Sequence, residues 1–196
     1  MAKSREIAKR RKAVANTRKI TKTMEMIATS KFRKAMNRLS ASRAYGDALE
    51  SLAGLLFSET SHPLLVPRTL VKHVSLWAFT GNRGLCGGFN SGVLRLLRQR
   101  REELVAAGTE VSLWITGKKG LAFARYGKLA VARSVVSPED KTRWEDVAPL
   151  AVELRDAFLA RRTDRVEIIV NRFTSTTSQK PVNELLFPLA LGKELS

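Results

Sequence analysis

The apolar residues in the first quarter of the chain are spaced as they would be along one side of a helix. Residues 5–57 contain no proline and are rich in good helix formers. Intervals of mostly three, four, six or seven positions place one set of residues in a single stripe: Ile7, Val14, Ile20, Met24, Ile27, Ala28, Ala35 and Leu39. Such a helix would be about 75 Å long. Because a narrow stripe buries little apolar surface, we expect the helix to lie against a partner.

The rest of the chain alternates between strand patterns and helix patterns. Runs of β-branched and aromatic residues predict strands at 71–80, 110–116, 129–136 and 165–173, and an edge strand within 176–188. Three-four spacing predicts helices at 90–107, 118–126 and 144–158. Asn90 or Ser91 is expected to cap the first of these, and Ser137-Pro138 to break the chain before the last. The alternation predicts an α/β fold, a Rossmann-like open sheet.

These patterns divide the 196 residues into three parts. Residues 1–58 are predicted to form the long helix. Residues 59–70 contain two prolines and polar turn residues, which is typical of a linker. Residues 71–196 are predicted to form the α/β domain.

Positive charge is concentrated on the predicted long helix. Residues 1–45 contain 14 Lys or Arg and 2 Asp or Glu, whereas the other 151 residues contain 21 and 16. A basic rod predicts an acidic partner, which is nucleic acid, an anionic membrane surface or acidic protein loops. The most basic run, residues 9–22, has no aromatic residues for base stacking. Physical reasoning alone therefore leaves two alternatives, a protein-binding helix and a nucleic-acid-binding α/β protein with a basic helical arm.

Composition also restricts the chemistry of the chain. The longest run without a charged residue, residues 84–94, is too short to span a membrane. Cys86 is the only cysteine, so neither an intramolecular disulfide nor a cysteine-based metal cluster can form. With only two histidines besides, we expect no metal site and no cofactor.

The glycine-rich segment 81–88 lies between a predicted strand and a predicted helix, where nucleotide-binding turns occur. Its glycines recur at every third residue from Gly81, whereas a dinucleotide site requires G-x-G-x-x-G and a P-loop requires a following Lys. We interpret it as a tight turn that lets helix and sheet approach each other. Cys86 has no base nearby to activate it, because His62 and His73 lie in other segments, and we predict a buried side chain. No set of residues predicts an enzyme active site.

Three segments resemble the gamma subunit of F-type ATP synthases. Residues 20–31 (ITKTMEMIATSK), after Asn16-Thr17, are similar to that family's N-terminal helix. Residues 178–181 and 185–189 resemble a later family segment. Residues 82–90 resemble the signature R-G-L-C-G-G-x-N through Arg83, Gly84, Leu85, Cys86, Gly87, Gly88 and Asn90. Asn82 stands where the family usually has Asp, which leaves an ion pair or cap at this turn in question.

The resemblance implies a non-catalytic rotor subunit without a cofactor. In that family the N-terminal helix is half of an antiparallel coiled coil inside the ring of alpha and beta subunits, and the α/β domain is the foot beside the epsilon subunit and the c ring. Acidic loops of the beta subunits would contact Lys9, Arg10, Arg11, Lys12, Lys22 and Met24. Contacts near the foot would come from Arg38, Arg43 and Tyr45.

The resemblance also implies where the protein acts. No nucleic acid is expected, and contact with the membrane would occur only through the complex, at the cytoplasmic face of the bacterial inner membrane. The family's C-terminal helix is expected to be absent, because residues 189–196 are too few to form it. The chain would then be a fragment or a truncated product, or a second polypeptide would supply the helix. We expect that this chain alone does not support normal rotary coupling.

Overall fold

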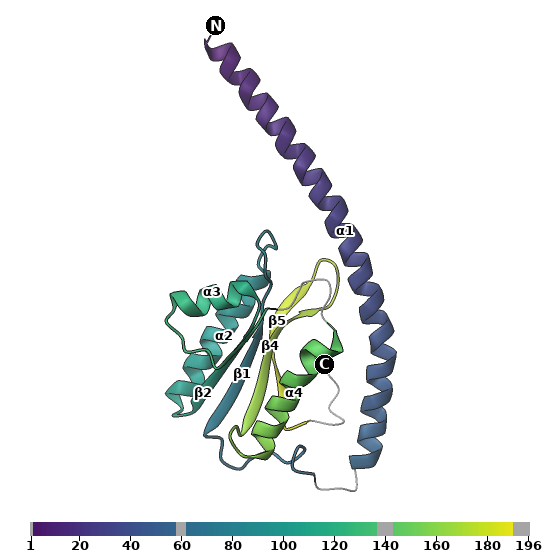
Figure 1. Cartoon of the computed structure of the whole chain (residues 1–196), viewed down its shortest axis with the longest axis vertical. Coiled ribbons are helices and arrows are strands. Elements are labelled where there is room, and N and C mark those ends of the chain that lie inside the picture. Colours follow the sequence, from purple (N-terminus) through teal and green to yellow (C-terminus); the bar gives the residue numbers. More distant parts are fainter. Residues whose placement is uncertain (1, 58–61, 137–142, 190–196) are drawn as a thin grey trace. The chain divides into compact units, whose positions relative to one another are not determined.

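The computed structural model describes residues 2–57, 62–136 and 143–189. They fall into two compact units, Met1–Leu56 and Phe57–Ser196. The first unit is the helix α1 (Ala2–Phe57), which runs for 56 residues and is therefore about 84 Å long (Figure 1). The predicted long helix is confirmed.

The apolar stripe of α1 is exposed over its length. Ile7, Val14 and Ile20 are each more than half exposed, and Met24 and Leu39 are 46% and 41% exposed. Local contacts along the helix are an exposed ion pair between Glu6 and Arg10 and threonine hydroxyls that donate to backbone carbonyls one turn earlier. An ion pair between side chains one helical turn apart adds only a few tenths of a kcal/mol to the stability of the helix. The stability of α1 therefore depends on apolar surface that a partner would cover.

The second unit is built on one five-stranded sheet (Figure 1). The strand order is β3-β2-β1-β4-β5. The bounds are β1 (His73–Phe79), β2 (Glu110–Thr116), β3 (Arg133–Val135), β4 (Arg165–Phe173) and β5 (Gln179–Phe187). The first four strands are parallel, and β5 is antiparallel to β4. The predicted α/β fold is confirmed, with a mixed rather than purely parallel sheet.

Helices cover both faces of the sheet (Figure 1). On one face lie α2 (Phe89–Ala106) and α3 (Lys118–Tyr126), and on the other lies α4 (Trp144–Leu159). The α2 side has its own core, in which Val93 and Leu97 pack with strand residues. The α4 side has a second core, where Leu154 and Phe158 pack against Trp77. Two apolar cores on one sheet explain why the strands read as nearly continuous apolar runs.

Three strands are shorter than the sequence pattern predicted, and the first of them, predicted at 71–80, is reduced to β1 (His73–Phe79). The strand expected at 129–136 is reduced to β3 because Leu129 still belongs to the end of α3: its N–H donates to the Ala124 carbonyl over 2.8 Å, after Lys128 at φ 50°. β5 begins at Gln179 because Thr174 and Ser178 are joined by a turn hydrogen bond. The predicted break at 137–138 and the last residues, 190–196, lie outside the described residues.

Thr80 joins β1 to β2 at the point where both strands end. Its N–H donates to the Thr116 carbonyl, and its hydroxyl donates to the same carbonyl over 2.6 Å and accepts the Gly120 N–H over 2.9 Å. Gly117 has φ 95°, and a Cβ there would lie 2.1 Å from the Thr80 carbonyl oxygen. Only glycine fits at this position.

A second interaction that fixes the fold is the ion pair between Arg100 and Glu167. Glu167 lies on β4 and is 3% exposed. Arg100 of α2 donates to both carboxylate oxygens of Glu167 over 2.8 Å, and the Asn183 amide donates to one of them. Burial raises the pKa of Glu167, but the Arg100 and Asn183 hydrogen bonds lower it further, so the net pKa lies below the ordinary value of a glutamate. The bidentate pair fixes α2 to the sheet.

We expect Gly117→Ala to lower the free energy of unfolding of the second unit by more than about 3 kcal/mol, because the new Cβ would overlap Thr80. Urea unfolding followed by tryptophan fluorescence measures this, since all three tryptophans lie in that unit. Gly84→Ala is the matched control, because its Cβ would meet only the Lys119 side chain, at 3.9 Å. Equal urea midpoints for the two variants would contradict the prediction.

We expect Glu167→Gln to lower the free energy of unfolding by about 3 kcal/mol at neutral pH, because it removes the buried carboxylate partner of Arg100 and leaves only the exposed Glu103 to pair with it. A carboxylate with a lowered folded-state pKa stabilises above its unfolded pKa, and this contribution is lost as pH falls below the ordinary glutamate value. The decrease in the free energy of unfolding from neutral to acidic pH should therefore be smaller in Glu167→Gln than in the unmodified protein. Glu153→Gln, which breaks an exposed pair with Arg133, should change stability by less than about 1 kcal/mol.

Candidate functional site: the basic helix and the glycine-rich turn

The candidate contact residues on α1 all have exposed side chains: Lys9, Arg10, Arg11, Lys12, Lys22 and Met24. Arg10 is paired with Glu6 over 2.7 Å, and Lys22 with Glu25 over 3.1 Å. Such exposed pairs are weak, so an acidic partner can displace them. The helix thus presents most of its positive charge directly to solvent.

The helix does not place these candidates on one face. At 3.6 residues per turn, Arg11 and Lys22 lie about 20° apart around the helix axis, whereas Lys9 lies about 140° from Lys22. Met24 lies about 160° from Lys22. Arg11 and Lys22 share a shallow surface groove with Val14 of the apolar stripe and with residues that the sequence analysis did not single out: Ala15, Arg18, Lys19 and Thr23.

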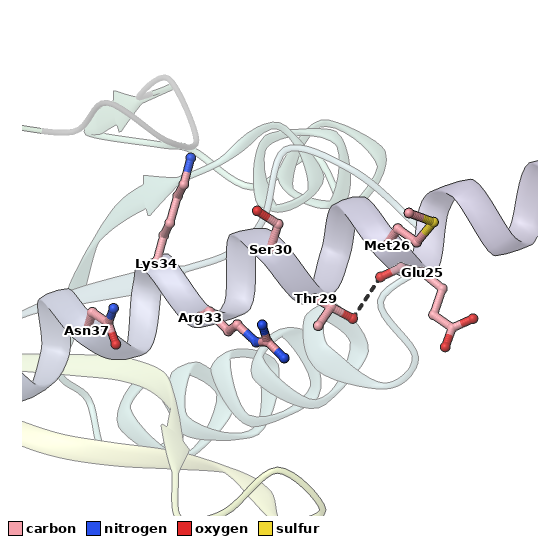
Figure 2. Close-up of a pocket in the computed structure, with 7 residues that line it drawn as sticks. All are labelled: Glu25, Met26, Thr29, Ser30, Arg33, Lys34 and Asn37. Atoms are coloured by element: carbon pink, nitrogen blue, oxygen red, sulfur yellow. Dashed lines mark hydrogen bonds between the residues drawn. The ribbon is translucent and has the colours of Figure 1, made fainter.

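A second shallow groove follows along α1 and is lined by Glu25, Met26, Thr29, Ser30, Arg33, Lys34 and Asn37 (Figure 2). The Thr29 hydroxyl donates to the Glu25 carbonyl over 2.8 Å. In Figure 2 the Lys34 and Arg33 side chains extend to opposite sides of the helix instead of converging on a point. This shape suits the side chains of a neighbouring protein better than it suits a small ligand.

The candidates for contacts near the foot also lie on α1. Arg38, Arg43 and Tyr45 are exposed, and the Tyr45 side chain is 69% exposed. Arg38 and Tyr45 are seven residues apart and lie about 20° from each other around the axis, but Arg43 lies about 160° from Tyr45. The helix therefore brings two of the three together.

Asn90 organises the glycine-rich turn between β1 and α2. Its side-chain oxygen accepts the Gly81 N–H over 2.8 Å, and its amide donates to the Arg83 carbonyl over 3.3 Å and to the Cys86 sulfur over 3.0 Å. Leu85 and Gly87 both have positive φ, at 59° and 56°. The turn is thus a fixed structure that one side chain holds from inside.

Three predictions about this turn are wrong. Cys86 is exposed rather than buried, and Leu85 beside it is 92% exposed. Neither Asn90 nor Ser91 caps α2, which begins at Phe89, because the Asn90 side chain is used within the turn. The glycines of the turn do not bring helix and sheet together, since a Cβ at Gly87 would touch nothing within 4 Å. Close approach occurs instead at Gly117 and Gly120.

Asn82 caps α3 although the two are far apart in the sequence. Its side-chain oxygen accepts the Lys118 N–H over 3.0 Å, at the first residue of α3. The absence of the family's usual Asp therefore does not remove the cap, because an amide oxygen accepts the same hydrogen bond. The sequence analysis named Asn82 but not its partner, since the two residues are 36 positions apart.

The described residues contain no cluster of three or more His, Cys, Asp or Glu side chains that could hold a metal ion. Among the same residues, no helix is both long enough and apolar enough to cross a membrane. Among the described residues, α1 and the glycine-rich turn between β1 and α2 carry exposed cationic and apolar side chains. Such surfaces are suited to binding other macromolecules.

Comparisons with known proteins agree on one family. A family profile described as ATP synthase matches residues 3–195. The ATP synthase gamma chain of Leptospira biflexa is 39% identical over 97% of this chain and 67% of its own length. That of Nitrosospira multiformis is 37% identical over 97% of this chain and 66% of its own length. This chain spans about two thirds of the length of these curated relatives.

The fold also matches a solved structure, the central stalk and c ring of the Tetrahymena thermophila mitochondrial ATP synthase. The TM-score is 0.65 at 23% sequence identity, over 86% of this chain and 72% of that chain. At this identity the similarity shows that the long helix and the α/β domain follow the same fold.

Substitution of Asn82 and of Asn171 by Asp tests the hydrogen bonds around the turn. The Asn82 side chain accepts a hydrogen bond from the Lys118 N–H, whereas the Asn171 amide donates one to the Phe89 carbonyl. We expect Asn82→Asp to raise the free energy of unfolding by about 0.5–1 kcal/mol at low salt, since a carboxylate at the start of α3 favours the helix dipole. Asn171→Asp should lower it by about 1–2 kcal/mol, since the donor is lost. Changes of the same sign in urea unfolding would show that the turn is held differently.

Proposed function

This chain belongs to the ATP synthase gamma-chain family, and from that premise we propose that it is the central-stalk rotor subunit of a proton-translocating F-type ATP synthase. The observation that carries the proposal is α1, a helix of 56 residues with an exposed apolar stripe and most of the chain's excess positive charge. A shaft that turns inside a ring of other subunits requires such a long element with no core of its own. The 97% coverage by gamma-chain relatives supports the same conclusion.

We propose that α1 is one half of an antiparallel coiled coil. Its stripe residues Ile20, Met24 and Ile27 are 46–61% exposed, and a second helix would remove them from water. Burying apolar side chains of this size contributes about 1.5–3 kcal/mol each. The domain organisation follows, with residues 1–58 as the shaft, 59–70 as a linker and 71–196 as the foot.

The basic side chains of α1 are proposed to face acidic loops of the beta subunits. Lys9, Arg10, Arg11, Lys12, Lys22 and Met24 are the proposed contacts. Because these residues point in several directions around the helix, different beta subunits would meet different side chains at one time. Rotation of the shaft can then bias nucleotide binding and release, since a subunit responds only to contacts that differ between its states.

The proposed role is non-catalytic, and the chemistry of ATP synthesis would take place in the partner subunits. Arg38, Arg43 and Tyr45 are proposed to lie near the foot, where the epsilon subunit and the c ring would bind. The protein would be peripheral, at the cytoplasmic face of the bacterial inner membrane, and would reach the membrane only through the complex. No cofactor and no nucleic acid enter this proposal.

Binding to a purified assembly of alpha and beta subunits tests the proposal. We expect co-elution of the full chain with that assembly, and an affinity about tenfold weaker for the variant Lys9→Gln, Arg11→Gln, Lys12→Gln, because three charges facing acidic loops are lost. The matched control removes three exposed charges from the α/β unit: Arg161→Gln, Arg162→Gln and Lys180→Gln. It should change the affinity less than about twofold.

Failure of the unmodified chain to co-elute would contradict the proposal. Tight binding to a short duplex DNA that weakens steeply with salt, in place of co-elution, would favour the basic arm as a nucleic-acid-binding element.

A further inference from the structure

Helix α4 is acidic, although the protein as a whole is strongly basic. Its 16 residues contain four Asp or Glu and one Arg, whereas the whole chain carries a formal net charge of +17. The helix lies on the face of the sheet opposite to α2 and α3 (Figure 1). The side chains of all four acids are exposed: Glu145, Asp146, Glu153 and Asp156. One side of the α/β unit therefore presents negative charge to solvent.

α4 also carries an exposed apolar strip, in addition to the side that it buries. On its core side Leu154 and Phe158 are fully buried. On its outer side Trp144 is 74% exposed, and Val152 and Leu159 are 41% and 40% exposed. At 3.6 residues per turn these three outer residues lie within about 80° of one another around the helix axis, and we call them the α4 outer strip. Because α4 is already anchored by its core side, the strip is available to a partner.

Two of the exposed acids lie beside this strip. Glu145 and Asp156 are about 20° and 40° from Val152 around the helix axis. Glu145 is in the first turn, where its charge also favours the helix dipole. Asp156 lacks that explanation, because it is in the last turn of α4, where the helix dipole favours cations. Its ion pair with Arg155, at 2.8 Å, is exposed and therefore weak.

We propose that the α4 outer strip, with Glu145 and Asp156 beside it, is a docking surface for a basic amphipathic helix of another protein. Such a helix offers Lys or Arg to the two carboxylates and apolar side chains to the strip. Trp144 is the main anchor, since tryptophan is enriched among the residues that carry most of the binding energy at interfaces. The surface shares no residue with the contacts proposed for α1 and does not depend on them.

The charges of this surface weigh against other partners. Anionic lipid and nucleic acid are both repelled by Glu145 and Asp156. A second copy of the chain that docked through its own α4 would place the same carboxylates opposite each other, which is unfavourable. A basic amphipathic helix, by contrast, complements both the charge and the apolar strip.

Trp144 makes the test specific, because it is 74% exposed whereas Trp77 and Trp114 are 4% and 7% exposed. A soluble quencher such as acrylamide therefore reduces mainly the fluorescence of Trp144 in the full chain. The probe is a synthetic helical peptide of Leu and Lys, which contains no aromatic residue. We expect increasing peptide concentrations to protect Trp144 from the quencher until the protection saturates.

We expect the charge variant Glu145→Gln, Asp156→Asn to weaken peptide binding about threefold to tenfold, since two exposed charges beside the strip are lost. The matched control Glu102→Gln, Glu110→Gln removes two exposed acids from α2 and β2. It should change the affinity less than about twofold.

The apolar variant Val152→Ser, Leu159→Ser should weaken peptide binding about fivefold or more, because less apolar surface is removed from water in the complex. Both side chains are about 40% exposed, so we expect the variant to remain folded, and its urea midpoint checks this. An unchanged affinity in the folded variant would overturn the inference, since binding would then be electrostatic attraction alone.

Equal weakening by the charge variant and its control would also overturn the inference, because it would show only general attraction to a cationic peptide. Equal protection of Trp144 by a glutamate-rich peptide or by phosphatidylserine vesicles would do the same. Protection that rises with the concentration of the chain alone would overturn it in favour of self-association. The α1 variant Lys9→Gln, Arg11→Gln, Lys12→Gln should leave the titration unchanged, so this inference and the proposed rotor function can fail separately.

Discussion

Thr80 lies at the carboxyl ends of β1 and β2, and its backbone and hydroxyl bind Thr116 and Gly120 within 2.6–2.9 Å. This joint leaves no room for a side chain at Gly117. It fixes where α3 starts relative to the glycine-rich turn, so that the Asn82 oxygen reaches the Lys118 N–H. The cap of α3 therefore depends on this contact between two strand ends, while Asn90 holds the turn itself.

The two units of the chain gain their stability in different ways. The α/β unit buries a core on each face of its sheet and adds the ion pair between half-buried Arg100 and buried Glu167, so both faces of the sheet are covered. In α1 the apolar stripe remains exposed, and the hydroxyls of Thr17 and Thr29 form hydrogen bonds within the helix itself. A helix of this kind is stabilised mainly by the proteins that bind it. This property suits a shaft whose contacts are proposed to change during rotation.

The balance of positive and negative charge also differs between parts of the chain. Acids and bases nearly balance between residues 139 and 196, whereas Lys and Arg outnumber Asp and Glu in residues 1–45 and in residues 80–138. Exposed cations in excess of the acids around them add little to folding and lower stability through their mutual repulsion. The excess positive charge of α1 therefore points to the acidic neighbour that is proposed along the shaft.

Sequence pattern alone was sufficient for the long helix, the strand–helix alternation and the edge position of β5. These features depend on residues close together in the chain, such as the proline-free run of α1 and Pro181 in β5. The family resemblance was also carried by local segments. The gamma-chain relatives confirm it over 97% of the chain.

The tertiary structure alone decided the details of the turn and the distribution of charge on surfaces. Cys86 was predicted to be buried because cysteine usually is, but the turn that Asn90 holds points away from the core. The partner of Asn82 and the joint at Thr80 connect residues 36 or more positions apart, which no local pattern reports. Arg98 of α2 lies over the Phe123 ring of α3 only because the sheet brings the two helices together.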